Sequence, residues 1–174
     1  MSRLAKSSLH VYFLLALPLV LLSIYPTRAD TSEEIFHWVA SQLNIEYAGN
    51  MPEIRFVDKK SLCTIFTRNN QKSYRRWKAR YGVLQAQRIL NIYLIELVGL
   101  FDPETSIVYV ADFLNPCRQQ SVVAHEITHF FQYRTRPITD QSELAASARR
   151  LHWEIEAHQI ENRFVQLHCP DQAE

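Results

Sequence analysis

The sequence is poor in glycine, with only three glycines in 174 residues. So little glycine excludes collagen-like and glycine-rich linker proteins. A hydrophobic fraction of 47% excludes an intrinsically disordered chain. The formal net charge of +1 gives no overall argument for nucleic acid as a partner. The length suits one domain that can bury a core of its own.

The first 29 residues form a candidate secretory signal. Arg3 and Lys6 precede Val11–Tyr25, a run without a charged residue. This run is shorter than the roughly 20 residues needed to cross a bilayer. Thr27 and Ala29 are small residues at the spacing that a signal peptidase prefers. We therefore expect cleavage after Ala29, a secreted or periplasmic protein, and no stable membrane span afterwards; an uncleaved amino-terminal anchor is the alternative.

Cleavage would change both the charge and the meaning of the cysteines. It removes three basic side chains and leaves 16 basic and 18 acidic ones, a net charge of −2. The three cysteines all remain: Cys63, Cys117 and Cys169. None has the close spacing of a structural zinc knuckle. In an oxidising compartment they allow one disulfide and one free thiol, with three pairings open.

Residues 30–174 predict a single α+β domain. Apolar residues at helical spacing predict helices over roughly 32–43, 69–82, 119–133 and 143–167. Alternating residues predict a short strand over 52–58. The stretch from Ile89 to Val110 is strand-like on both sides of turn residues 102–106, which predicts a β-hairpin. We expect a small antiparallel sheet whose hairpin packs against the helix over 119–133.

Residues 125–129 read His-Glu-Ile-Thr-His, an HExxH motif. Histidines four residues apart share one face of a helix, so His125 and His129 can bind the same metal ion. Glu126 lies about 100° round the helix, beside the metal rather than on it. From there it can act as the general base toward a metal-bound water. The motif thus predicts a zinc site with a catalytic glutamate.

A catalytic zinc usually has three protein ligands, so a third donor is needed. The carboxylate candidates downstream are Glu143, Glu154, Glu156 and Glu161. On a helical wheel of the last helix, Glu156 borders the apolar stripe, whereas Glu154 and Glu161 fall toward the solvent side. We therefore expect Glu156 to be the third ligand. The alternative role for Glu156 is an interhelical ion pair with an arginine.

The HEITH string and the later WEIEAHQIEN string resemble the zincin metallopeptidases of the gluzincin type. The spacing HExxHxxQ with a later EAH is most similar to small secreted bacterial proteins, most of them uncharacterised. The resemblance covers roughly 98–164. It implies zinc on His125, His129 and Glu156, with Glu126 as general base and an edge strand of the hairpin that binds extended substrate.

Two parts of the gluzincin pattern are missing from the sequence. No NExxSD string surrounds Glu156, so no acidic residue is assigned to orient a histidine. The oxyanion-stabilising group is also open, with Tyr133, His152 and His158 as candidates. Gln132 lies one turn after His129, where it can contact a ligand or substrate or be an ordinary polar residue of the helix.

The stretch from Lys59 to Ile95 contains no acidic residue. It holds nine of the 16 basic residues of the expected mature chain: Lys59, Lys60, Arg68, Lys72, Arg75, Arg76, Lys78, Arg80 and Arg88. Segment 59–88 could bind an anionic component of the cell envelope. The alternative, which the spacing of Tyr74, Trp77 and Tyr81 favours, is a solvated helix with its aromatic side against the core.

These features predict a secreted zinc-dependent hydrolase, with a peptide or protein as substrate and no nucleic-acid partner. One alternative enzyme keeps the zinc and cleaves a cell-wall amide. An alternative of another class is a non-catalytic zinc protein whose basic segment 59–88 binds an anionic envelope component.

Overall fold

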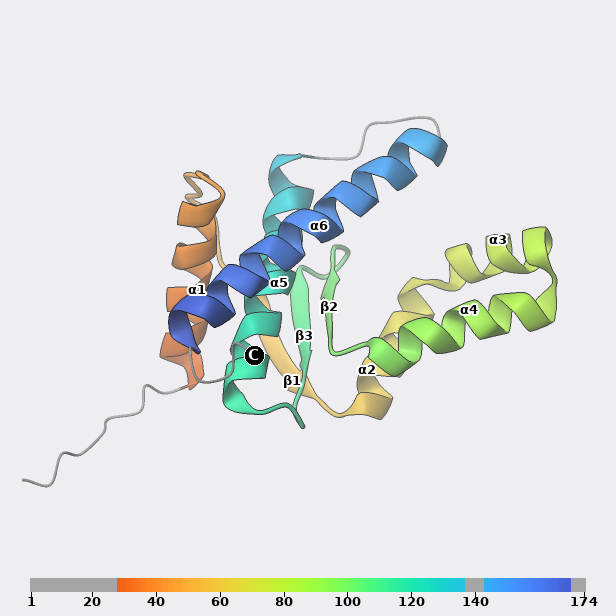
Figure 1. Cartoon of the computed structure of the whole chain (residues 1–174), viewed down its shortest axis with the longest axis horizontal. Coiled ribbons are helices and arrows are strands. Elements are labelled where there is room, and N and C mark those ends of the chain that lie inside the picture. Colours follow the sequence, from red (N-terminus) through yellow and green to blue (C-terminus); the bar gives the residue numbers. More distant parts are fainter. Residues whose placement is uncertain (1–27, 137–142, 170–174) are drawn as a thin grey trace, which may run out of the picture.

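We describe residues 28–136 and 143–169 of a computed structural model of the chain (Figure 1). They form an α+β domain dominated by helices. The elements in chain order are α1 (Arg28–Gln42), β1 (Glu53–Val57), α2 (Lys59–Asn69), α3 (Gln71–Tyr81), α4 (Val83–Glu96), β2 (Gly99–Asp102), β3 (Ile107–Ala111), α5 (Pro116–Thr135) and α6 (Glu143–His168). The proposed signal lies almost wholly outside the described residues, and cleavage after Ala29 would remove only the first two residues of α1.

The sheet has three strands in the order β1-β3-β2. Strands β2 and β3 form the expected antiparallel hairpin around residues 102–106. The expectation of a wholly antiparallel sheet was wrong, because β1 pairs with β3 in parallel. The three helices between β1 and β2 leave and rejoin the sheet at the same end, since Val57 pairs with Ala111 and Gly99 pairs with Val110. Strand β2 then brings the chain back to the starting end of the sheet before β3 begins. A parallel pair needs such a crossover.

The segment between β1 and β2 corrects a second expectation. Residues 89–96 were expected to be a strand and are instead the second half of α4, and α2 had not been expected at all. Ala86 and Leu90 are the buried residues of α4, one helical turn apart. Lys59 Nζ donates to the backbone oxygens of Ile95 and Leu97 at 3.1 and 2.6 Å, which satisfies the end of the helix.

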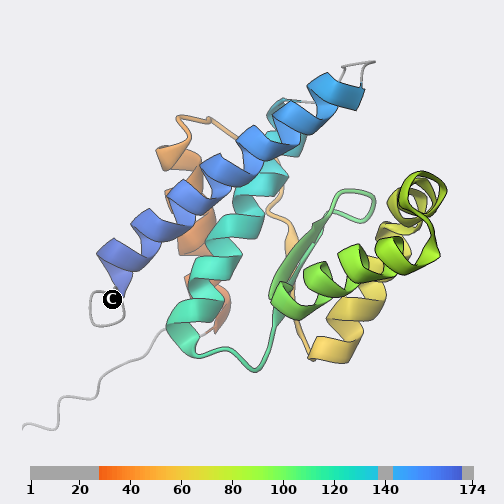
Figure 2. The same cartoon turned by 45° about the vertical axis from the view of Figure 1, so that its right-hand side comes forward.

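Helix α5 is the centre of the fold. It packs against β2 and β3 on one side and against α1 and α6 on the other (Figure 2). Its buried residues occur all round the helix, including Val123, Ile127 and Phe131. Asn115 caps its start by accepting a hydrogen bond from the Arg118 backbone N–H at 2.8 Å. The central helix of the core is therefore the helix that carries HExxH.

A disulfide joins Cys117, at the start of α5, to Cys169, directly after α6. The sequence allowed three pairings, and the structure selects this one and leaves Cys63 free. The bond holds together the two helices from which the candidate site is built. Within the described ranges, no helix combines the length and the apolar character that a membrane crossing requires.

Candidate metal centre

The two histidines of the motif point at the same place. His125 Nε2 and His129 Nε2 are 3.1 Å apart. Glu154 Oε2, from α6, lies 3.7 Å from the first of these atoms and 3.5 Å from the second. Ligands of a tetrahedral zinc ion, bound at about 2.0–2.1 Å, stand about 3.3 Å from one another. The three donor atoms thus have the spacing that such an ion requires, and together they could hold a metal.

Hydrogen bonds on the far side of each ring fix which nitrogen faces the group. His125 Nδ1 lies 3.1 Å from Glu161 Oε2. His129 Nδ1 lies 2.8 Å from Gln132 Oε1. Both oxygens are acceptors, so both Nδ1 atoms carry the proton. A histidine that binds a metal is neutral, so its lone pair would then be at Nε2, facing the Glu154 carboxylate. A proton takes this place when no metal is bound.

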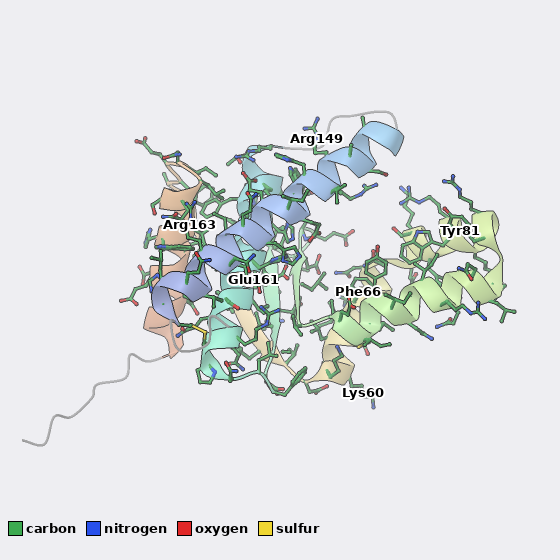
Figure 3. The ribbon with its side chains drawn as sticks, in the orientation of Figure 1. Lys60, Phe66, Tyr81, Arg149, Glu161 and Arg163 are labelled. Carbon is green, nitrogen blue, oxygen red and sulfur yellow. A yellow bond between two sulfur atoms is a disulfide. The ribbon has the colours of Figure 1, made fainter. Side chains whose placement is uncertain are left out.

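The acceptors that orient the rings are themselves held in place. Glu161, a residue of α6, is buried where this helix faces α5 (Figure 3). It accepts hydrogen bonds from Arg118, at the start of α5, and from His158 Nδ1. Gln132 donates to the Trp153 backbone oxygen at 3.0 Å and to Glu156 Oε2 at 2.9 Å. Supporting contacts of this kind orient the ligands of metal sites and raise their basicity.

Glu156 does not lie beside the histidines. Its carboxylate accepts hydrogen bonds from Gln132 and from Arg136 Nη1, the latter at 3.1 and 2.8 Å. The structure thus places Glu156 in the interhelical ion pair and places Glu154, not Glu156, with His125 and His129. The reason is the orientation of α6, which turns the face of Glu154 and Glu161 toward α5. The expectation that Glu161 points to solvent was wrong, since it is only 5% exposed.

Glu126 is buried between α5 and β2. Burial raises the pKa of its carboxyl, against the opposing charges of His125 and His129. The backbone N–H of Phe101 on β2 hydrogen-bonds to this carboxylate. Gly99, also on β2, leaves room for it, because a Cβ there would lie 2.6 Å from Glu126 Oε1. The side chain is thus fixed between the motif helix and the hairpin.

The charges of the cluster are strongly coupled. Burial lowers the pKa of His125, but hydrogen bonds to Glu154 and Glu161 outweigh burial and raise it to about 10. His125 and then His129 hold the pKa of Glu154 well below its usual range. Burial raises the pKa of Glu161, yet His125 and Arg118 lower it to about 2. Both glutamates are therefore anionic at neutral pH, as metal ligands and their partners need to be.

A second group, made of His125, His158 and Glu161, also has the spacing to hold a metal. It would use His125 Nδ1 instead of Nε2. Arg118 hydrogen-bonds to Glu161, and the positive charge of its guanidinium opposes a cation there. His158 lies against His125, with ring centroids 4.7 Å apart, and is the one of the three oxyanion candidates that contacts the cluster.

The sequence contained a signal for the residues that were missed. Glu154, His158 and Glu161 are spaced by four and three residues, so they share a helical face. The helical wheel correctly placed the two glutamates on one face but predicted that this face is exposed to solvent.

No protein-family model, no curated protein and no solved structure matches this chain. The resemblance to zincins therefore stays a prediction.

Proposed function

We propose that this protein is a zinc-dependent hydrolase of the gluzincin type, and that its substrate is a peptide or protein. The observation that carries the proposal is the convergence of His125 Nε2, His129 Nε2 and Glu154 Oε2 on one point. Two imidazoles and one carboxylate are the ligand set of many catalytic zinc sites. When bound, zinc supplies Lewis acidity, which polarises a carbonyl and acidifies water.

Access to the site favours catalysis over a purely structural metal. The Glu154 side chain is 55% exposed, whereas those of His125 and His129 are 11% and 17% exposed. One side of the cluster is thus open to water and substrate while the other is closed by the core. Structural zinc sites, by contrast, are usually closed by four protein ligands.

Glu126 is the group that would move the proton. Burial raises the pKa of its carboxyl, which makes the carboxylate a stronger base toward a water molecule. The proton that it takes can then be donated to a leaving amine. Its carboxylate lies beside β2, which is an edge strand of the described sheet and pairs only with β3 there. An extended peptide added along β2 would bring its carbonyl groups past this glutamate.

We also propose that the protein works outside the cytoplasm, secreted or in the periplasm. The apolar segment near the amino terminus supports this, and so does the Cys117–Cys169 disulfide, because disulfides persist in oxidising compartments.

The test compares metal content and cleavage in a matched set of variants. The purified protein should hold about one zinc ion per chain and should cleave a mixed peptide library. Glu126→Gln should keep the zinc and lose cleavage, since only the proton carrier changes. Glu154→Ala should lose zinc, and Glu156→Ala should retain it. If the unmodified protein bound zinc and cleaved no peptide, the site would be a metal-binding site only and the proposed peptidase activity would be wrong. Loss of zinc in Glu156→Ala but not Glu154→Ala would overturn the ligand assignment.

A further inference from the structure

Helices α3 and α4 form a hairpin that projects from the body of the domain (Figures 1 and 2). Gly82, with φ of 82°, makes the turn between them. The two helices are held to each other by Trp77 and Tyr93, whose rings stack with planes 4° apart. The aromatic side of α3 thus packs on α4 rather than on the main core. Helix α3 buries no residue of its own.

The tip of this hairpin is apolar. Tyr81 ends α3 at the outer end of the projection (Figure 3) and is 49% exposed. Val83 and Leu84 begin α4 and are 54% and 80% exposed. Single exposed apolar residues are ordinary on protein surfaces. Three together at the end of a projection, each about half exposed or more, form a small apolar surface in contact with solvent.

Basic residues occur within two turns of the tip on both helices. Lys78, Arg80 and Arg88 are all exposed, and the Arg80 guanidinium lies 5.4 Å from the centre of the Tyr81 ring. No acidic residue occurs between Lys59 and Ile95 to reduce their field. A short apolar surface flanked by basic residues has the chemistry of proteins that bind the surface of membranes.

We propose that the tip of the α3–α4 hairpin binds the surface of a bilayer that contains anionic lipids. Tyr81, Val83 and Leu84 enter the headgroup region, and Lys78, Arg80 and Arg88 contact lipid phosphates. The tip is convex, so a protein partner would need a matching pocket, whereas lipids rearrange around any shape. A second copy of the chain is disfavoured because it would bring two cationic tips together. Each basic residue near an anionic surface strengthens binding about five-fold.

Vesicle co-sedimentation tests the proposal. The protein used is residues 30–174, the chain expected after cleavage of the signal. It should bind phosphatidylcholine vesicles that contain phosphatidylglycerol and not those of phosphatidylcholine alone. Leu84→Ser should weaken binding about ten-fold through lost apolar burial. Ile95→Ser, an equally exposed change at the base of the same helix, should leave binding as it was.

A second pair of variants tests the charges. Lys78→Gln with Arg88→Gln should weaken binding about 25-fold, because two contacts of about five-fold each are lost. Lys60→Gln with Arg150→Gln removes the same charge away from the tip and should have no effect. Equal binding to both vesicle types, or equal loss with Leu84→Ser and Ile95→Ser, would overturn the proposal. Loss with the charge variants and none with Leu84→Ser would also overturn it and would indicate a soluble polyanion.

Discussion

The helix pair α5–α6 and the helix pair α3–α4 are opposite in what they bury. The first pair buries polar groups, among them His125, Glu126 and Glu161, in the centre of the protein. The second pair leaves apolar groups such as Leu84 and Ile92 in solvent. In these residues, each pair departs from the usual distribution of polar and apolar side chains.

The reversal is supported differently in the two places. Among the described residues, no buried side-chain nitrogen or oxygen lacks a hydrogen-bond partner, so the polar cluster is stabilised by its own network. Leu84 and Ile92 on α4 are 80% and 60% exposed, so other side chains of the described residues cover little of their apolar surface. A buried polar cluster and an exposed apolar tip therefore both point to ligands, a cation for the first and a membrane for the second.

The largest difference between the regions should appear in stability. Phe131 is fully buried against Phe36 and Phe130, and Phe131→Ala should lower the free energy of unfolding by about 4 kcal/mol. Trp77→Ala in the hairpin should cost less than half of that, because Trp77 is only half-buried and contacts one neighbouring helix. Urea unfolding followed by circular dichroism measures both. Equal costs would mean that the hairpin belongs to the main core.

The disulfide between α5 and α6 should stabilise the domain, whereas the free cysteine on α2 should not. Cys117→Ser with Cys169→Ser opens a loop with a sequence separation of 52 and should cost about 3 kcal/mol, chiefly through greater freedom of the unfolded chain. Cys63→Ser is the matched control on α2 and should change stability little. Thermal unfolding of the three proteins decides the matter, and an unchanged midpoint in the double variant would contradict the pairing.

Gly99 links the hairpin β2–β3 to the buried cluster. A Cβ at this position would lie 2.5 Å from Val122 Cγ1 and 2.6 Å from Glu126 Oε1, so Gly99→Ala requires both side chains, or the β2 backbone, to move. We expect about 2 kcal/mol of lost stability and a loss of cleavage with zinc retained. Metal analysis and a peptide assay separate the two effects. Gly49→Ala, in the loop after α1, is a comparison outside the site. Full cleavage by Gly99→Ala would show that the Glu126 side chain has room to move.

The central helix of the site could be predicted because its pattern is local. HExxH, the apolar residues around it and the turn residues before β3 each specify their own structure over a few residues. The choice of third ligand could not be predicted in the same way. It depends on how α6 crosses α5, and the two candidate faces of α6 differ only slightly in apolar character. Arg118 on α5 hydrogen-bonds to Glu161 on α6, a contact between distant residues that no local sequence pattern displays, whereas the contact of His158 with Glu161 lies within α6.

Glu161→Gln tests whether that face supports the metal site. The amide can still accept from His125 Nδ1, but without the charge it makes the imidazole less basic, so zinc affinity should fall about ten-fold. Competition with a chelating dye measures the affinity. Glu53→Gln, an exposed glutamate paired with Arg55, removes the same charge far from the cluster and should leave the affinity unchanged. A similar fall in both variants would mean that net charge, and not the contact with His125, sets the affinity.

The segment 89–96 escaped prediction for another reason, since periodicity alone does not separate a strand from a buried helical segment in a short apolar run. The contact that favours the helix comes from Lys59, distant in sequence, whose ammonium group satisfies the backbone oxygens of Ile95 and Leu97. Lys59→Met keeps the length of the side chain and removes the donors, and should cost about 1 kcal/mol.

This cost should be confined to the hairpin. Amide hydrogen exchange should speed up in the last turn of α4, while zinc affinity stays the same, because the cluster lies on α5 and α6. Lys60→Met is the neighbouring control, since Lys60 is exposed on the same helix. If Lys59→Met and Lys60→Met gave the same exchange rates, the contact of Lys59 would not be what stabilises the end of α4. The helix would then be determined by its packing and by the residues of 83–96 themselves.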